Sequence, residues 1–369
     1  AKAVQRGFQI CPVPPEKAGG RTFLIAIGKA APAMLGAAME AFPQAAVALA
    51  VTHHENTASL PGAEILHAGH PVPDAAGAEA AERVIEVLTS AGPDDRVIAL
   101  ISGGGSALLP APPDAVSLAD KARLNQLLLS AGLDIVQMNM IRQQVSRLKG
   151  GGFARIAAPA QVYAYLLSDV IGDDLRAIAS GPTVGPIGTA ASAIDTLQKA
   201  GIWDQVPPAI KAHLQSAPVT SHDVTAVNTL VGSNRLSLEA MQIAAQEIGL
   251  QVKIVNDALI GDVAYAARQV IADLRSVPEP TALLFGGETT VRLKGTGRGG
   301  RNQELALRVA LNMPDTPQTW VFLSGGTDGR DGPTNAAGGL VDAGTAGRIA
   351  AAGVEAQALL ANNDSFAAL

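Results

Sequence analysis

Two basic residues stand where an apolar strand pattern gives way to a helix pattern. Lys29 follows the run Thr22–Ile27, and Arg301 stands directly before the expected helix Asn302–Leu311. A cation at such a position faces the positive end of the helix dipole, which costs a few tenths to about 1 kcal/mol unless an anion is bound. Both residues are therefore candidate ligands for a phosphate or a carboxylate, and an exposed side chain in an ordinary turn is the alternative.

A run of glycines follows the buried strand pattern Arg96–Ile101. The run consists of Gly103, Gly104, Gly105 and Ser106. Without Cβ atoms, backbone N–H groups can converge on a phosphate, so the run indicates a cradle for a nucleotide or a substrate, unless it is only a tight turn. A serine-hydrolase elbow is excluded, because Leu108 stands where that motif needs glycine.

Carboxylates follow other strand patterns. Asp169 comes directly after the run Val162–Leu167, and Asp328 lies in the glycine-rich turn 324–334. Carboxylates in such places hold Mg²⁺ beside substrate phosphates or accept a hydroxyl proton. Asp173 and Asp174 fit helix N-caps equally well, so Asp169 has the better claim to function.

Four polar residues recur at helical spacing in the segment 139–151. They are Asn139, Arg142, Ser146 and Lys149. The pattern predicts one helix that presents these side chains on a single face. A solvated face that ends at a glycine cap is the simpler interpretation, with Lys149 well placed at the helix end.

The stretch Gly295–Gly300 matches G-x-G-x-x-G, the dinucleotide fingerprint. After Gly295, the stretch contains three further glycines, Gly297, Gly299 and Gly300. The preceding strand carries Arg292 and Lys294, and no acidic ribose ligand ends the next strand, so the fingerprint is weak. The surrounding positive charge instead suits a polyphosphate or a phosphoryl group in transfer.

The elements that must position these residues alternate between strands and helices, which is the α/β signature. The expected strands are Thr22–Ile27, Ala45–Val51, Glu64–His67, Arg96–Ile101, Val162–Leu167, Asn228–Val231, Gln251–Val255, Ala282–Phe285, Thr289–Leu293 and Trp320–Leu323. The expected helices are Ala30–Ala41, Ala75–Leu88, Ala119–Ser130, Arg235–Gly249, Val263–Leu274 and Asn302–Leu311. The turn-rich stretch Ser216–Asp223 is the candidate linker between two domains, residues 1–221 and 222–369.

Composition narrows the class of protein. The chain has 27 Lys and Arg against 33 Asp and Glu, and this net charge of −6 disfavours nucleic acid as a partner. No segment has the length of a membrane span or the pattern of a secretory signal. Cys11 is the single cysteine, so no disulfide forms within the chain. We therefore expect a cytoplasmic protein that binds a small molecule, with its oligomeric state, for example a homodimer, left open.

Taken together, the motifs resemble the glycerate 2-kinase family, the class II glycerate kinases with a C-terminal MOFRL domain. The matching stretches are IGKAAPAM at 27–34, GHPVPD at 69–74, LISGGGSALL at 100–109, NMIRQQVSRLKGG at 139–151, LLSDVIGDDLRAIASGPT at 166–183, GRGGRNQELAL at 297–307 and SGGTDGRDGPTNAAG at 324–338. They span nearly the whole chain in order. Members of the family are often named hydroxypyruvate reductase.

The resemblance implies a Rossmann-like parallel-sheet α/β/α domain followed by a smaller α/β MOFRL domain. It implies ATP- and Mg²⁺-dependent phosphorylation of D-glycerate to 2-phosphoglycerate in an interdomain cleft. Lys29 and Arg301 would be the leading catalytic residues, Asp169 a proton acceptor or metal ligand, and Asp328 a metal ligand. The positions that would bind substrate or nucleotide are Gly103, Gly104, Gly105, Ser106, Asn139, Arg142, Ser146, Lys149, Gly297, Gly299 and Gly300.

Family members usually have a further helix before this sequence begins and a Thr/Gly/Asn-rich motif after it ends, so we expect a longer C-terminal domain. Two other classes stay open. An NAD(P)H-dependent hydroxypyruvate reductase would use the glycine pattern at 295–300, and a non-catalytic hydroxy-acid binding protein would keep the cleft without turnover.

Overall fold

The computed structural model describes residues 1–217, 224–277, 280–316 and 319–369. Within them the chain divides into two units, Ala1–Ser233 and Asn234–Leu369. The first unit ends later than the expected boundary at residue 221, because the next strand still pairs with the sheet of that unit. The expected linker Ser216–Asp223 lies, apart from its first two residues, outside the described residues.

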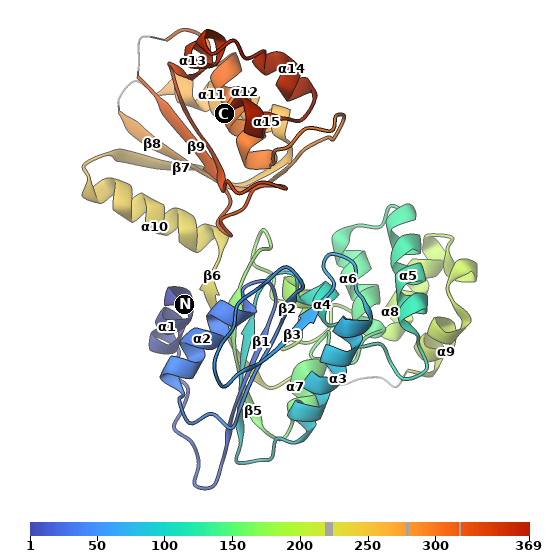
Figure 1. The fold of residues 1–369 in the computed structure, drawn as a ribbon. Coiled ribbons are helices and arrows are strands. Elements are labelled where there is room, and N and C mark those ends of the chain that lie inside the picture. Colours follow the sequence, from blue (N-terminus) through green and yellow to red (C-terminus); the bar gives the residue numbers. More distant parts are fainter. Residues whose placement is uncertain (218–223, 278–279, 317–318) are drawn as a thin grey trace. The chain divides into compact units, whose positions relative to one another are not determined.

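Six strands form one parallel sheet in the first unit (Figure 1). They are β1 (Thr22–Ile27), β2 (Val47–His53), β3 (Glu64–Ala68), β4 (Arg96–Ile101), β5 (Gln161–Leu167) and β6 (Ala226–Gly232), in the order β3-β2-β1-β4-β5-β6. All six residues of β1 are buried, as expected for a strand that is covered on both faces. The order reverses between β1 and β4, and ligands of such sheets bind beyond the carboxyl ends of the strands at that reversal.

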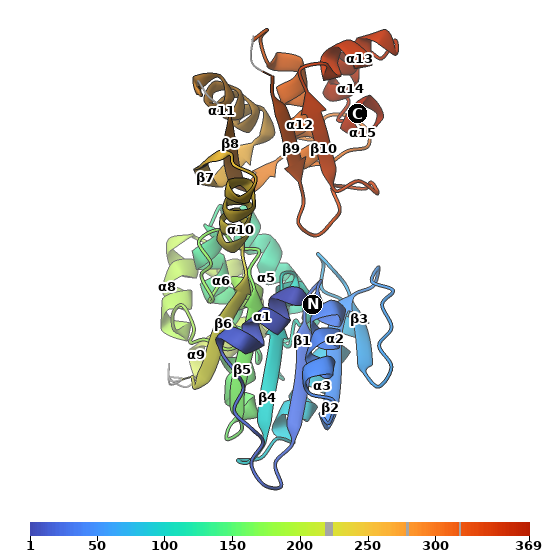
Figure 2. The ribbon, with the colours of Figure 1, turned by 90° about the vertical axis from the view of Figure 1, so that its left-hand side faces the viewer.

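Helices cover both faces of this sheet (Figure 2). The covering helices are α1 (Lys2–Ile10) and α2 (Ala31–Ala41) on one face, and α3 (Ala75–Thr89) and α7 (Gly152–Ala157) on the other. Alternate residues of β1 serve the two cores: Phe23 and Ile25 pack on the α3 side, and Leu24 packs on the α2 side. The Rossmann-like α/β/α arrangement is thereby confirmed.

A group of helices with its own core lies beside the sheet in the first unit (Figure 1). Its members are α5 (Leu118–Ser130), α6 (Ile135–Gln144), α8 (Ala190–Lys199) and α9 (Pro208–Ser216). Short turns connect these parts, namely α4 (Gly105–Leu108), η1 (Ile178–Ser180) and η2 (Trp203–Gln205). Capping boxes at Ser117, Asp134 and Thr189 fix the starts of α5, α6 and α8.

The second unit is built around one buried helix, α12 (Arg301–Asn312). Its strands are β7 (Gln251–Asp262), β8 (Thr281–Thr290), β9 (Val321–Gly325) and β10 (Gly338–Asp342), paired as parallel β7-β8 and antiparallel β9-β10. Its other helices are α10 (Asn234–Glu247), α11 (Val263–Ser276), α13 (Thr345–Ala351), α14 (Ala356–Ala361) and α15 (Ser365–Ala368). Leu305, Leu307 and Ala306 of α12 each belong to a different core cluster, so this helix joins the parts of the unit.

The strands of the second unit differ from the sequence prediction. The expected strand Ala282–Phe285 and the first two residues of the expected strand Thr289–Leu293 belong to one strand, β8, which ends at Thr290. The glycines between them lie within this strand and do not form a loop. Pairing with β7 through two register shifts accommodates Gly286 and Gly287 within that strand. The strand β10 was not expected, because its sequence is short and begins with two glycines.

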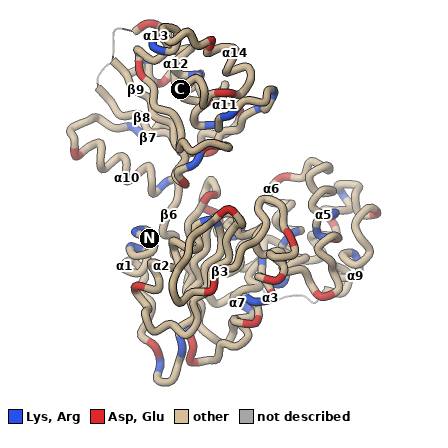
Figure 3. The backbone as a smooth tube through the Cα atoms, in the orientation of Figure 1, with Lys and Arg blue, Asp and Glu red and all other residues tan. Residues whose placement is uncertain are grey.

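Charged residues of both signs are distributed over each unit (Figure 3). In the described part of the chain, none of the helices is long and apolar enough to cross a membrane.

The junction between β1 and α2 yields a stability prediction. Gly28 has φ +122°, and an added Cβ would collide with the backbone and hydroxyl of Ser102. Gly28→Ala should therefore lower the free energy of unfolding by about 3 kcal/mol. Gly132→Ala is the control, because Gly132 has φ +68° but open space around it, and should cost about 1 kcal/mol. Urea unfolding followed by circular dichroism measures both, and equal losses would contradict the steric argument.

Candidate active site

Lys29 projects from the carboxyl end of β1. Its backbone N–H donates to the carbonyl of Gly103 at 2.9 Å, and its own carbonyl accepts from the Thr52 hydroxyl at 3.5 Å and the Asn56 amide at 3.4 Å. The side chain is exposed. The backbone is thus fixed on three sides, and the ammonium group is left available to a ligand.

The glycine run after β4 brings three functional side chains together. A Cβ on Gly104 would lie 3.2 Å from both Lys29 Cγ and His70 Cδ2. A Cβ on Gly103 would collide with the carboxylate of Asp169. The structure therefore gathers Lys29, His70 and Asp169 around the run, and the predicted neighbourhood of Lys29, Asp169 and these glycines is present. Gly104 has φ +85°, which only glycine adopts readily.

His70 is a functional candidate that the sequence motifs discussed above did not single out. Among the described residues its ring has no hydrogen-bond partner, and the ring is half-buried. Burial is the largest cause that lowers the pKa of His70, followed by the nearby charges of Lys29 and His53, while Glu55 and Asp169 oppose the shift. The imidazole is consequently neutral near pH 7 and can accept a proton. Its place in GHPVPD was the signal that could have found it.

Ser106, at the far end of the glycine run, contacts a buried lysine. Lys149 Nζ donates to the carbonyl of Ser106 at 2.9 Å and to its hydroxyl at 3.0 Å. That hydroxyl also lies 2.9 Å from the hydroxyl of Ser180. Lys149 is only 7% exposed, and burial, with a smaller contribution from Arg142, lowers its pKa to about 7.

The predicted helix over residues 139–151 is wrong beyond its first half. Helix α6 ends at Gln144, because the Val145 carbonyl accepts from Lys121 Nζ at 2.9 Å and the Arg147 N–H donates to Ala111 at 2.8 Å. These bonds replace the next helical turn. The predicted single face therefore does not exist, and the solvated end that we expected for Lys149 is a buried position.

The four residues of that predicted face have separate environments. Asn139 is buried on α6, and Arg142, on the last turn of α6, donates to Asn125. Ser146 lies beyond the helix, where its hydroxyl accepts from the Lys149 N–H at 3.4 Å. Contact with a substrate stays a prediction for all four positions.

In the second unit, Arg301 is the first residue of α12, which begins one residue earlier than the expected helix Asn302–Leu311. Its guanidinium lies 3.1 Å from the carboxylate of Glu288, and both side chains are about half exposed. The buried carboxylate of Asp331 accepts from the N–H groups of Asn302 at 3.1 Å and Gln303 at 2.8 Å. Asp331 thus supplies the negative charge that the helix dipole favours, which offsets the cost of placing Arg301 there.

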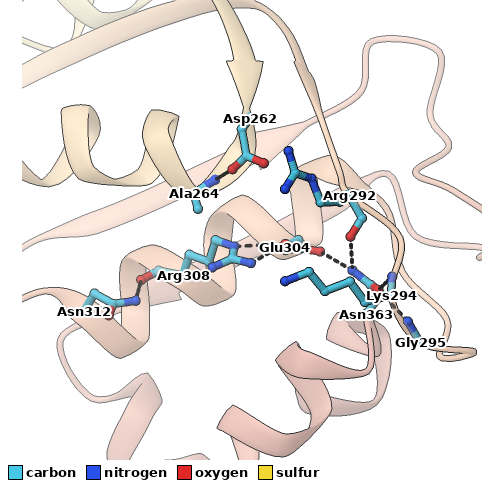
Figure 4. Close-up of polar contacts among 9 residues, drawn as sticks. All are labelled: Asp262, Ala264, Arg292, Lys294, Gly295, Glu304, Arg308, Asn312 and Asn363. Carbon is cyan, nitrogen blue, oxygen red and sulfur yellow. Dashed lines mark hydrogen bonds and ion pairs between the residues drawn. The ribbon is translucent and has the colours of Figure 1, made fainter.

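The glycine-rich loop at 295–300 is held by the chain's own residues 362–365. The backbone N–H groups of 294–298 donate to oxygens of Asn362, Asn363 and Asp364, and Figure 4 shows Asn363 between this loop and the buried Glu304. Added Cβ atoms on Gly297, Gly299 and Gly300 would collide with Asp364, Ser365 and Asp331, in that order. Close packing within the unit therefore explains these glycines, and their contact with a nucleotide stays a prediction.

The carboxylates that the structure describes do not form a complete metal cage. Asp328 is exposed and accepts from the Arg330 N–H at 3.2 Å, which closes a turn. Among the described residues there is no group of three or more His, Cys, Asp or Glu that could hold a metal ion. Mg²⁺ that arrives with substrate phosphates needs only one or two protein carboxylates, and the exposed Asp169 beside the glycine run fits that need.

Comparison with known proteins agrees with this arrangement. Residues 3–215 match the domain of unknown function DUF4147, and residues 281–369 match the MOFRL family. The chain is 38% identical to the D-glycerate 2-kinase of Thermotoga maritima over 361 residues, which cover 95% of this chain and 85% of that one. It is also 38% identical over 366 residues to a protein of Agrobacterium vitis named "Putative hydroxypyruvate reductase", covering 96% and 83% of the two chains.

The fold of this chain, over its whole length, agrees with that of a solved relative. The crystal structure of the glycerate kinase from Thermotoga maritima superposes with a TM-score of 0.88 at 35% sequence identity, and the match covers 100% of this chain and 91% of that one.

The two aspartates of the 324–334 turn should separate in a stability measurement. Asp331→Ala leaves two N–H groups of α12 and the side-chain amide of Asn302 without their acceptor, so it should lower the free energy of unfolding of the second unit by about 3 kcal/mol. Asp328→Ala is the control and should change it by less than about 0.5 kcal/mol. Urea unfolding decides between them, and a smaller loss for Asp331→Ala than for Asp328→Ala would refute the capping role.

Proposed function

Since the chain belongs to the glycerate 2-kinase family, we propose that it transfers the γ-phosphoryl group of ATP to the 2-hydroxyl of D-glycerate, giving 2-phosphoglycerate and ADP. The observation that carries the proposal is the position of Lys29, whose exposed side chain lies against a glycine run at the reversal of strand order in a sheet that matches a glycerate kinase. In such a sheet this is where ligands bind.

Lys29 and Arg301 are the proposed catalytic cations. Phosphoryl transfer spreads negative charge over the oxygens of the moving group, so two positioned cations lower the barrier by stabilising that charge. The two residues belong to different units, and the proposal requires the units to bring both to one phosphoryl group, in a cleft that excludes water. The guanidinium of Arg301 is about half exposed beside Glu288 and is therefore accessible to a phosphoryl group.

The proton of the 2-hydroxyl needs an acceptor. Asp169 is exposed, lies against Gly103 and belongs to the same group of side chains as Lys29, so we assign it this role. His70, neutral near pH 7, is a second acceptor within the same group. Either group acts only on a substrate whose hydroxyl is held beside the glycine run.

Mg²⁺ is proposed to enter with ATP and to neutralise its phosphate oxygens. Asp169 would hold it, and Asp328 would contribute a second carboxylate.

We also propose a cytoplasmic location, which the single cysteine, Cys11, supports. The small-molecule substrate and the nucleotide are the only partners that the proposal needs.

The structure disfavours a hydroxypyruvate reductase. The sheet with the dinucleotide-binding strand order is in the first unit, and its first strand-to-helix turn carries Gly28 and Lys29 instead of the fingerprint. The literal fingerprint at 295–300 follows β8 in the second unit, where the loop packs on residues 362–365. No observation therefore favours a nicotinamide site in either place.

The two catalytic cations can be tested with matched controls. Lys29→Ala and Arg301→Ala should each lower the rate of D-glycerate-dependent ADP formation at least a hundredfold, because each removes charge stabilisation of the transition state. Lys17→Ala, at the opposite end of β1, and Arg268→Ala, on α11, are the controls and should stay within about twofold of the parent rate. Losses below tenfold for both Lys29→Ala and Arg301→Ala would disprove the assignment.

The rival activity has a direct measurement. Mixing the protein with NADH and hydroxypyruvate should give no loss of absorbance at the nicotinamide band, whereas ATP, Mg²⁺ and D-glycerate should give ADP. Consumption of NADH at a rate comparable to ADP formation would favour the reductase. Binding of D-glycerate without either reaction would favour the non-catalytic binding protein.

A further inference from the structure

Three basic side chains meet in the first unit without an acidic partner. We call Lys121 of α5, Arg142 of α6 and Lys149, in the turn after α6, the basic cluster. Lys121 donates to the carbonyls of Pro110 and Val145, and Arg142 donates to the side-chain oxygen of Asn125.

Lys149 donates to the carbonyl and the hydroxyl of Ser106. Among the described residues, every hydrogen bond that the cluster donates is therefore accepted by a neutral oxygen. Neighbouring acidic residues are paired elsewhere. Glu82 and Asp114 lie beside Arg147, and Asp174 lies beside Arg176. Within the described part of the first unit, the cluster therefore has no acidic hydrogen-bond partner.

Burial makes this arrangement costly. Burial is the first cause that lowers the pKa of Lys121 and Lys149, and the mutual repulsion of the cluster adds to it, with Arg142 acting on both lysines. Burial alone lowers the pKa of Arg142. Charged groups are seldom buried without a partner, because the lost hydration is not replaced. An oxyanion at the cluster would replace it and would favour the protonated lysines.

The cluster adjoins the proposed active site. Lys149 lines a small cavity together with Ile27 at the end of β1, Gly105 of the glycine run and Ala179. The Nζ of Lys149 donates hydrogen bonds to Ser106. Ser106 lies two residues after Gly104, which faces both Lys29 and His70. Lys29 therefore contacts one end of the glycine run, and the basic cluster contacts the other.

We propose that the basic cluster is the subsite for the carboxylate of the hydroxy-acid substrate, and that Lys149 takes up a proton when this carboxylate binds. The proposal rests on the proposed function, since it names the part of D-glycerate that this end of the site recognises. A carboxylate is assigned to this end of the glycine run rather than a triphosphate, because Lys29, the proposed phosphate ligand, contacts the other end. Phosphate would then remain at the Lys29 end of the glycine run.

The sign of the pH effect follows from the pKa of Lys149. With the site empty this pKa is about 7, so most chains carry a neutral Lys149 at pH 8 and a charged one at pH 6. An anion raises the pKa of Lys149, so binding at pH 8 takes up most of one proton at Lys149, and binding at pH 6 takes up far less. The affinity should accordingly fall as the pH rises above 7.

Isothermal titration of the full chain with D-glycerate, without ATP, tests the proposal. Titrations at pH 6 and pH 8 in buffers of different ionisation enthalpy give the number of protons exchanged. We expect uptake of close to one proton at pH 8 in the parent protein, and at least tenfold weaker binding in Lys149→Met at pH 6. Lys149→Arg keeps the charge, so it should bind with little proton uptake at pH 8.

Lys199→Met, on the exposed surface of α8, is the control and should bind and take up protons like the parent. Circular dichroism melting should show that Lys149→Met is folded, because it replaces a buried cation with an apolar side chain of similar length. Unchanged affinity in Lys149→Met, or no proton uptake by the parent at pH 8, would overturn the proposal.

Two further titrants separate the sources of the anion. Inorganic phosphate and a non-hydrolysable ATP analogue should bind without the proton uptake that depends on Lys149. If either of them shows that uptake and D-glycerate does not, the cluster is a phosphate site and the carboxylate assignment is refuted. A separate measurement of ADP formation distinguishes failure of the subsite proposal from failure of the proposed function. Normal turnover with unchanged binding in Lys149→Met would refute only the subsite. Absence of turnover in the parent protein would refute the proposed kinase function.

Discussion

The candidate site depends on the close approach of two strand ends. The Lys29 N–H donates to the Gly103 carbonyl at 2.9 Å, and the Ser102 N–H donates to the Ile27 carbonyl at 2.8 Å, so the loops after β1 and β4 are joined by backbone bonds. This contact requires glycine at position 28, where a Cβ would collide with Ser102. Because the two loops are fixed to each other, the side chains that they carry keep a constant separation, which a phosphate and a hydroxyl both need.

Charge is treated differently in the two units. In the second unit, Arg301 has Glu288 as a partner, and the buried Asp331 satisfies the N-terminus of α12. In the first unit, the partly buried Lys121 and the buried Lys149 lie near Arg142, and among the described residues they donate hydrogen bonds only to neutral oxygens. The first arrangement is stable by itself, and the second gains from a ligand. Electrostatic complementarity in the first unit is thus completed by an anion that the chain does not provide.

Much of the fold follows from apolar periodicity, and the parts of the site that extend from strands follow with it. The runs Thr22–Ile27 and Arg96–Ile101 are strands at the predicted bounds, and Lys29 lies at the end of the first as expected. Tertiary bonds decided the rest. The turn after Gln144 depends on Lys121, which is distant in sequence, so spacing alone predicted a longer helix. His70 was missed because its neighbours come from other strands.

Glycine patterns show most clearly why sequence alone stops short of a site. Gly103 faces Asp169, and Gly104 faces Lys29 and His70. Because neither glycine has a Cβ atom, these functional side chains can lie directly against the glycine run. The glycines at 295–300 have the same spacing as a dinucleotide fingerprint, yet they face the chain's own residues, namely 362–365 and, for Gly300, Asp331. Both runs are required by close approach, and only the identity of what approaches distinguishes them. In the first unit the sheet order decides which groups approach the glycines, and in the second unit the packing around α12 decides it. The proposed kinase function therefore rests on Lys29 rather than on the dinucleotide fingerprint at 295–300.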